Sequence, residues 1–322
     1  MSIRVAVAML AALGIAFMLS VLVPWSDLAA LYGEDPALAW AIAVELRLPR
    51  AGLALIYGAM LGAAGAAVQA LFANPLASPD LTGTTSGAAL GAVVTAYILG
   101  FSAPIALSLG SIAGALGSLL LLLALAGRKA ETATLLLAGL AISALAGALT
   151  TLALALAPSP FAFYDAYDWL MGSLVDRSLV QMAFAGIPAA FVLILLLRLV
   201  RPLDSLALGE EVSQSLGHDL LSVRRQVVCL TAIGVGACVA ICGAIGFVGL
   251  VAPIFARRLT HGHPGRAILP AALIGALLLT AADIAVRLAP LGRTLPIGVV
   301  TALLGAPFFL WLVAHMRWRM AS

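Results

Sequence analysis

The feature that most constrains this chain is a succession of apolar segments, each about 20 residues long, that recurs from one end to the other. A helix of about 20 residues rises about 30 Å, which is the thickness of the hydrocarbon core of a bilayer. Only 10% of the 322 residues are charged and the mean hydropathy is +1.15. Leu and Ala are abundant, and the alternating pattern of membrane β-strands is missing from the sequence. The sequence therefore predicts an all-α, polytopic transmembrane helix bundle.

Ten such segments predict ten spans that make up a single transmembrane domain, 1–322. The first is expected to be an uncleaved span, because its apolar run is longer than the core of a typical signal peptide. The stretch 226–256 is long for one span, and Gly243, Gly246 and Gly249 predict a break between two short or tilted spans. The expected spans lie near 5–23, 51–71, 84–101, 104–126, 133–156, 180–199, 226–243, 245–259, 267–288 and 297–316.

The basic residues predict the orientation of the chain. Lys and Arg in short loops collect on the cytoplasmic side of a membrane. If the N-terminus is inside, twelve of the 17 basic residues fall on the cytoplasmic side. We therefore expect both termini in the cytoplasm and the chain in a bacterial inner membrane. The basic residues form no patch with interleaved aromatic residues, so nucleic acid is not an expected partner.

Several kinds of chemistry are not expected of this chain. Lys129 is the only lysine and no Ser or Thr follows it, so the chain lacks a phosphate-binding loop and ATP would have to be hydrolysed by another subunit. Cys238 and Cys242 lie one helical turn apart without a His or carboxylate nearby, and we expect them to be small packing residues. His261 and His263 lie in a basic loop without carboxylates, where solvation is expected rather than metal binding. No catalytic, cofactor-binding or metal site is predicted.

Asp283 keeps a second class of function open. Ion-coupled transporters hold ionisable groups deep within the bundle, and Asp283 is the one good candidate in the predicted spans. Arg287 follows one turn later, which predicts a local ion pair near the outer end of the span. The alternative hypothesis is thus a secondary transporter in which Asp283 titrates.

Arg47 and Arg50 are predicted to lie in an outer loop, where basic residues are disfavoured. Contact with lipid headgroups would explain the pair. Because arginine suits bidentate recognition of carboxylates, an acidic docking partner would explain it equally well.

The longest cytoplasmic connection, about 204–219, is predicted to contain a short amphipathic helix. Gly209 and Gly217 bound it, two glutamates occupy its first turn, and two apolar residues follow one turn apart. Such a helix could lie on the membrane or dock into a partner.

Three long motifs resemble the signature of FecCD-type permeases, which serve binding-protein-dependent type II ABC importers for iron-siderophores, haem or cobalamin. The first is RLPRAGLALIYGAMLGAAGAAVQALFANPLASPDLTGTTSGAALG, residues 47–91. The second is GAIGFVGLVAPIFARRL, residues 243–259, and the third is LPIGVVTALLGAPFFLWL, residues 295–312. Their order and spacing match the family from Arg47 to the C-terminus. One departure is Ile254, which stands where the family often has a histidine.

The resemblance implies a helical permease that pairs with a second permease subunit around a central pathway, and we expect this dimer to be a homodimer. Two ATP-binding subunits, which hold ATP and Mg, would lie below, and a periplasmic substrate-binding protein would dock above. The spans 133–156, 245–259 and 297–316 would line the pathway.

The resemblance also implies three sets of functional residues. Docking of the binding protein would use Arg47, Arg50 and Arg287. A cytoplasmic gate would use Asn74, Leu76, Thr132 and Ala133. Coupling to the ATPase would use Gly209, Glu210, Glu211, Val212, Ser213, Gln214, Ser215, Leu216 and Gly217.

The expected cargo is an iron complex. The outer segment 169–178, WLMGSLVDRS, is more similar to that of haem and siderophore permeases than to that of cobalamin permeases. Cobalamin or another metal chelate is the alternative within the same family.

Overall fold

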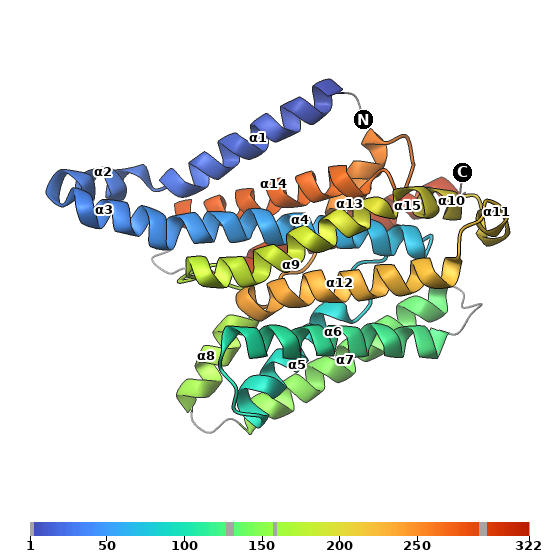
Figure 1. Ribbon diagram of the computed structural model, residues 1–322, viewed down its shortest axis with the longest axis horizontal. Coiled ribbons are helices and arrows are strands. Elements are labelled where there is room, and N and C mark those ends of the chain that lie inside the picture. Colours follow the sequence, from blue (N-terminus) through green and yellow to red (C-terminus); the bar gives the residue numbers. More distant parts are fainter. Residues whose placement is uncertain (1–2, 127–131, 157–159, 290–294, 322) are drawn as a thin grey trace.

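The structure, a computed structural model, describes residues 3–126, 132–156, 160–289 and 295–321, and every regular element in these ranges is a helix. The long helices run side by side in an elongated bundle (Figure 1). In chain order the helices are α1 (Ile3–Leu22), α2 (Trp25–Glu34), α3 (Pro36–Ile42), η1 (Ala43–Arg47), α4 (Leu48–Leu71), α5 (Thr84–Val93), η2 (Val94–Ile98), α6 (Pro104–Ala126), α7 (Thr132–Ala155), α8 (Pro160–Leu170), α9 (Leu179–Arg198), α10 (Val200–Leu206), α11 (Glu210–Ser215), α12 (Leu220–Cys242), α13 (Val248–Leu259), α14 (Ile268–Leu288) and α15 (Ile297–Ala321).

The two ends of the bundle carry different elements. Helices α2, α3 and α8 lie at one end, where α4 begins and α14 ends, and α10 and α11 lie at the other (Figure 1). We call the first the arginine end, because Arg47, Arg50 and Arg287 lie there, and the second the α11 end. The candidate functional residues are thus divided between two well-separated regions.

The predicted polytopic helical bundle is confirmed. Each of the ten expected spans corresponds to a helix, and among the described residues seven helical segments are long and apolar enough to cross a membrane. Helix α13 has 12 residues and rises only about 18 Å, too little to cross a bilayer core by itself. Ten crossings and cytoplasmic termini therefore remain predictions.

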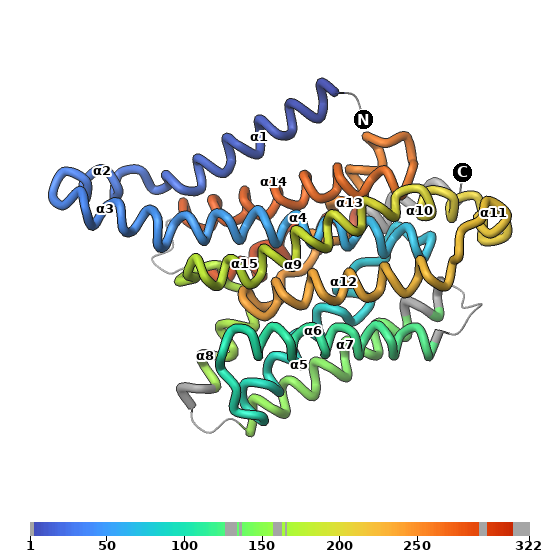
Figure 2. The backbone as a smooth tube through the Cα atoms, in the orientation of Figure 1, coloured from blue at the N-terminus to red at the C-terminus, as the bar shows by residue number. Residues whose placement is uncertain are grey.

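Helices α4 and α12 form the centre of the bundle. In the helical segment Pro36–Leu71, which contains α4, and in α12, 78% of the most apolar stretch is buried within the protein. The buried share in α1 is 6%. Figure 2 shows α1 at the edge of the bundle and α4 between α14 and α9. Cys238 and Cys242 are fully buried among the core residues of α12, as expected of small packing residues.

Glycines at four-residue spacing allow α4 and α14 to pack closely. In α4, Gly58 lies against the backbone of Gly275, and Gly62 lies against the carbonyl group of Ala271, both in α14. A methyl group at either glycine of α4 would overlap a carbonyl oxygen. Small residues that allow such backbone contact are how helices associate where lipid replaces water. The α4–α14 contact is therefore specified by residues that lack side chains.

A second glycine contact joins α5 and α6 in the same way. Gly87 lies against Gly114, and Gly91 lies against Gly110. Gly87 and Gly91 are four residues apart in α5, and Gly110 and Gly114 are four residues apart in α6, so the two glycines of each helix lie on one face.

The break predicted between 226 and 256 is present, but its first helix is a full span. Helix α12 has 23 residues and begins at Leu220, six residues earlier than the expected span 226–243. The Asp219 side chain accepts hydrogen bonds from two backbone N–H groups of the first turn, which starts the helix ahead of the basic residues Arg224 and Arg225. The non-helical segment 243–247 then leads into the short helix α13.

The loop predicted around Arg47 and Arg50 is wrong, because both residues lie in helix. Helix α3 continues through the π-helical turn η1 directly into α4, with Pro49 in the first turn of α4. A proline inside a helix lacks an N–H and crowds the preceding turn, and a wide π turn accommodates this. The guanidinium groups are consequently carried on a rigid element.

Candidate functional site

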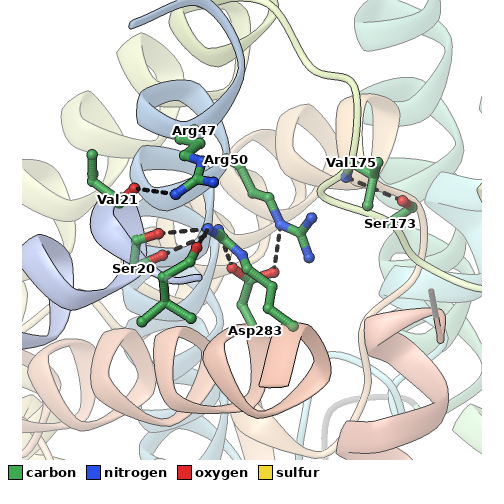
Figure 3. A network of polar contacts seen from close by, with 9 residues as sticks. Ser20, Val21, Arg47, Arg50, Ser173, Val175 and Asp283 are labelled. Carbon is green, nitrogen blue, oxygen red and sulfur yellow. Dashed lines mark hydrogen bonds and ion pairs between the residues drawn. The ribbon is translucent and has the colours of Figure 1, made fainter. Parts of the chain in front are cut away.

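Asp283 of α14 joins two of the three predicted docking arginines at the arginine end (Figure 3). Its Oδ1 accepts a hydrogen bond of 2.8 Å from Nε of Arg50, and its Oδ2 accepts one from Nη2 of Arg287. The Asp283 side chain is 1% exposed. The predicted Asp283–Arg287 ion pair is therefore present. Sequence spacing gave no signal for the bond to Arg50, which is 233 residues away.

Arg287 and Arg47 both bind the C-terminal end of α1. Nη1 of Arg287 donates to the carbonyl oxygen of Ser20, and Nη1 of Arg47 donates to the carbonyl oxygens of Leu22 and Pro24 at 3.0 and 3.2 Å. The last carbonyl groups of a helix lack partners within the helix and carry partial negative charge, so cations there are stabilising. These two arginines hold the C-terminal end of a helix that is otherwise mostly exposed.

The three arginines thus come together at one end but differ in what they offer to a partner. The side chains of Arg287 and Arg50 are 7% and 16% exposed. In Figure 3 the dashed line from Arg50 to Asp283 starts at Nε, and neither terminal nitrogen of Arg50 carries such a line. Docking itself remains a prediction for all three residues.

The short helix predicted between Gly209 and Gly217 is present as α11. Both glycines have positive φ angles, +105° and +86°, which glycine adopts without steric cost. Glu210 forms an ion pair with Arg224 of α12. The glycines set the turns into and out of α11, which therefore stands out at its end of the bundle (Figure 1).

Helix α11 is anchored by one buried polar residue, and apolar side chains in and beside it are exposed. The Ser213 hydroxyl is buried and lies 2.6 Å from the Ser205 hydroxyl of α10. Leu208, Val212 and Leu216 are 66%, 42% and 59% exposed. We call these three residues the α11 apolar surface. An exposed apolar cluster on an anchored helix is suited to fit into a groove of another protein.

The two halves of the predicted cytoplasmic gate lie in different kinds of structure. Asn74 is 5% exposed, and its Oδ1 accepts a hydrogen bond of 2.9 Å from the backbone N–H of Leu76, which stabilises the turn after α4. Thr132 and Ala133 form the first turn of α7, and their side chains lie outside the described residues. The gating role of all four remains a prediction.

The loop 72–83 that contains Asn74 also packs against α7 further along the chain. The backbone of Leu81 lies against Gly139, where a side chain would overlap its carbonyl oxygen. The two predicted halves of the gate therefore belong to elements in direct contact.

Asp80, in the same loop, is a carboxylate that the sequence analysis missed. Its Oδ2 accepts a hydrogen bond of 3.1 Å from the N–H of Phe247, and its Oδ1 accepts one of 2.8 Å from the Thr85 hydroxyl. Phe247 has a φ of +66° in the break before α13. Asp80 therefore ties the loop after α4 to the helix break. Asp80 lies between the expected spans 51–71 and 84–101, so it is an addition to the expectation that Asp283 is the good candidate within the spans.

Two further contacts hold the helix break. The Tyr57 hydroxyl donates to the carbonyl oxygen of Gly243 at 3.0 Å, and the N–H of Ser173 donates to the carbonyl oxygen of Cys242 at 2.8 Å. Non-helical backbone is tolerated at membrane depth only where other protein groups or water satisfy it. Here the partners are the Tyr57 side chain of α4, the Asp80 side chain of the loop 72–83 and the backbone N–H of Ser173.

Known proteins resemble this chain over nearly its whole length. The FecCD transport family matches residues 5–315. The vitamin B12 import system permease protein BtuC of Vibrio cholerae is 39% identical over 302 residues, covering 90% of this chain and 85% of that protein. BtuC of Salmonella paratyphi A is 44% identical over 274 residues, covering 84% and 82%.

Two solved structures resemble the fold. A metal-chelate type ABC transporter in an inward-facing conformation has a TM-score of 0.82 and 30% identity, covering 97% of this chain and 99% of that one. PsaBC from Streptococcus pneumoniae, solved with a Fab, has a TM-score of 0.56 and 20% identity over 81% and 90% of the two chains, and supports the fold alone. With the matched motifs and the extent of these similarities, the chain belongs to the FecCD transport family and is a membrane permease of the ABC importer type.

Proposed function

We infer that this protein is the permease of a binding-protein-dependent importer for cobalamin or a closely related corrinoid, in the bacterial inner membrane. The observation that carries the proposal is the 39% and 44% identity to permeases named for vitamin B12 import. This favours the alternative cargo over the iron complex expected from the segment 169–178. An iron chelate remains the second candidate, on the strength of that segment.

The proposed mechanism uses both ends of the bundle. A substrate-loaded binding protein docks at the arginine end, and two ATPase subunits receive the α11 apolar surfaces of two permease subunits. ATP binding closes the ATPases, moves the α11 helices with them, and switches the central pathway between outward-open and inward-open states. The permease supplies the pathway, and the energy comes from ATP bound with Mg in the partner subunits.

The ion pairs at Asp283 support an ATP-driven rather than an ion-coupled mechanism. Both carboxylate oxygens of Asp283 accept hydrogen bonds from arginine side chains of the same chain, so the carboxylate already has cationic partners and is poorly placed to bind a transported ion. Uptake is therefore expected to depend on ATP and the binding protein, and not on a proton or sodium gradient.

The decisive experiment reconstitutes the permease in proteoliposomes with the ATPase and binding protein encoded beside it. Uptake of cobalamin, haem and a ferric siderophore is then measured with and without ATP. ATP-dependent entry of cobalamin supports the proposal, and entry of an iron complex alone would establish the second candidate. Uptake driven by an imposed ion gradient without ATP would overturn the ABC mechanism.

A further inference from the structure

We propose that Asp283 is a positioning residue for docking: it fixes the guanidinium group of Arg50 so that its two terminal nitrogens face an acidic group on the binding protein. Asp283 itself would not touch the partner. The inference rests on the proposed function, because it concerns how that function recruits its binding protein.

The geometry divides the donors of Arg50 into two sets. A guanidinium group has one N–H on Nε and four on its two terminal nitrogens. Asp283 takes the Nε donor at 2.8 Å, and within the described parts of the chain the terminal nitrogens of Arg50 make no hydrogen bond. Figure 3 shows no dashed line from either of them. These terminal donors form the fork that binds a carboxylate in two parallel hydrogen bonds.

The other two arginines each use at least one terminal nitrogen for a hydrogen bond within the chain. Arg287 uses Nη2 for Asp283 and Nη1 for Ser20, and its side chain is 7% exposed. Arg47 uses Nη1 to donate to carbonyl oxygens at the end of α1. Of the three arginines implied by the family resemblance, Arg50 is therefore assigned the direct contact, and Arg287 and Arg47 stabilise the elements around it.

Asp283 is well suited to hold Arg50 still. Its carboxylate is 1% exposed, it is fixed from the other side by Arg287, and α14 packs against α4 through backbone contacts at Gly58 and Gly275. A donor that is already fixed loses less conformational entropy when a partner binds. The buried carboxylate thereby raises the affinity for an acidic partner although it has the same sign of charge.

A positioning role and simple electrostatics predict opposite effects on binding when the Asp283 charge is removed. Replacing Asp283 with Asn makes the arginine end more positive by one charge, which by itself attracts an acidic partner more strongly and raises the association rate. If Asp283 positions Arg50, the same replacement weakens binding, and the loss appears in the dissociation rate.

The test measures binding of the periplasmic binding protein to the reconstituted permease–ATPase complex by surface plasmon resonance. We expect Asp283→Asn to weaken binding about tenfold, mainly through faster dissociation. Asp283→Glu keeps the charge but displaces the carboxylate, and it should also weaken binding severalfold. Asp168→Asn is the matched control, because Asp168 is an exposed carboxylate of α8 at the same end, and it should change binding less than twofold.

Tighter or unchanged binding by both Asp283 variants would overturn the inference. If Asp283→Asn fails to assemble, as judged by gel filtration of the complex, Asp283→Glu together with Arg50→Lys decides the matter. Arg50→Lys keeps the charge but loses the fork, so unchanged binding by both of these variants would overturn the inference as well. A wild-type complex that binds no binding protein would instead overturn the proposed function.

Discussion

The arginine end and the α11 end of the bundle differ in what they bury. At the arginine end the ion pairs are inside: the side chains of Asp283 and Arg287 are 1% and 7% exposed. At the α11 end the ion pair between Arg224 and Glu210 is outside, with 28% and 56% exposure, and the leucines face outward instead. One end is therefore suited to recognise a partner by charge and direction, and the other by apolar shape. Four substitutions test this contrast.

The largest effect is expected from Asp283→Ala. Removing one partner of a buried ion pair leaves uncompensated charge on Arg287 and costs about 3–5 kcal/mol of unfolding free energy. The measurement is denaturant unfolding of the purified protein in detergent. A loss below about 1 kcal/mol would mean that the arginine end behaves like an exposed surface, and the contrast would fail.

Leu216→Asp tests the α11 apolar surface. A charge in a buried apolar contact leaves an unpaired group, so ATP-driven uptake should fall at least about tenfold. The isolated permease should keep its stability, because Leu216 is 59% exposed. Leu221→Asp is the control: this leucine is 55% exposed on α12, outside the α11 apolar surface, and a smaller loss is expected. Equal losses in both variants would argue against docking through α11.

Ser213→Ala tests how α11 is anchored. It removes a buried hydroxyl that lies 2.6 Å from Ser205, and the expected loss of stability is about 1 kcal/mol. Uptake should fall further than stability alone explains, because α11 would be held less firmly. Ser215→Ala, at an exposed position of the same helix, is the comparison. Indistinguishable uptake in the two variants would show that the serine pair does not transmit force.

The smallest effect is expected from Glu210→Ala. The ion pair with Arg224 is exposed and screened by salt, so its removal should cost less than about 1 kcal/mol. The loss of unfolding free energy in Glu210→Ala is measured beside that of Asp283→Ala in the same detergent. The difference between the two losses measures how far the two ends differ. Similar losses would remove the contrast on which the comparison rests.

What the sequence could predict was local. Hydrophobic runs of bilayer length located the spans, and the glycines at 209 and 217 located α11, because both signals depend on residues close together in the chain. Glycine pairs at four-residue spacing, such as Gly87 with Gly91, are a local signal of the same kind, because the spacing places both on one face of a helix that can be closely approached.

What the sequence could not predict was long-range or depended on an unusual turn. Arg50 meets Asp283 across 233 residues, and Asp80 meets Phe247 across 167, and no periodicity relates such positions. The helix through Arg47 was missed because Pro49 normally signals a helix end, and here a π turn lets the helix continue. The docking, gating and coupling roles rest on family resemblance and await the experiments above.

The backbone contacts of α4 have a mechanical consequence. Gly58 and Gly62 lie against α14, and Gly65 lies against Gly249 of α13, with no side chains between that could slide or rotate. We therefore expect α4, α13 and α14 to move together as one rigid unit during transport. Helix α4 spans about 36 Å over its 24 residues, with Arg50 at one end and the loop of Asn74 and Asp80 following the other. We expect a displacement imposed where Arg50 lies to be passed along α4 to that loop.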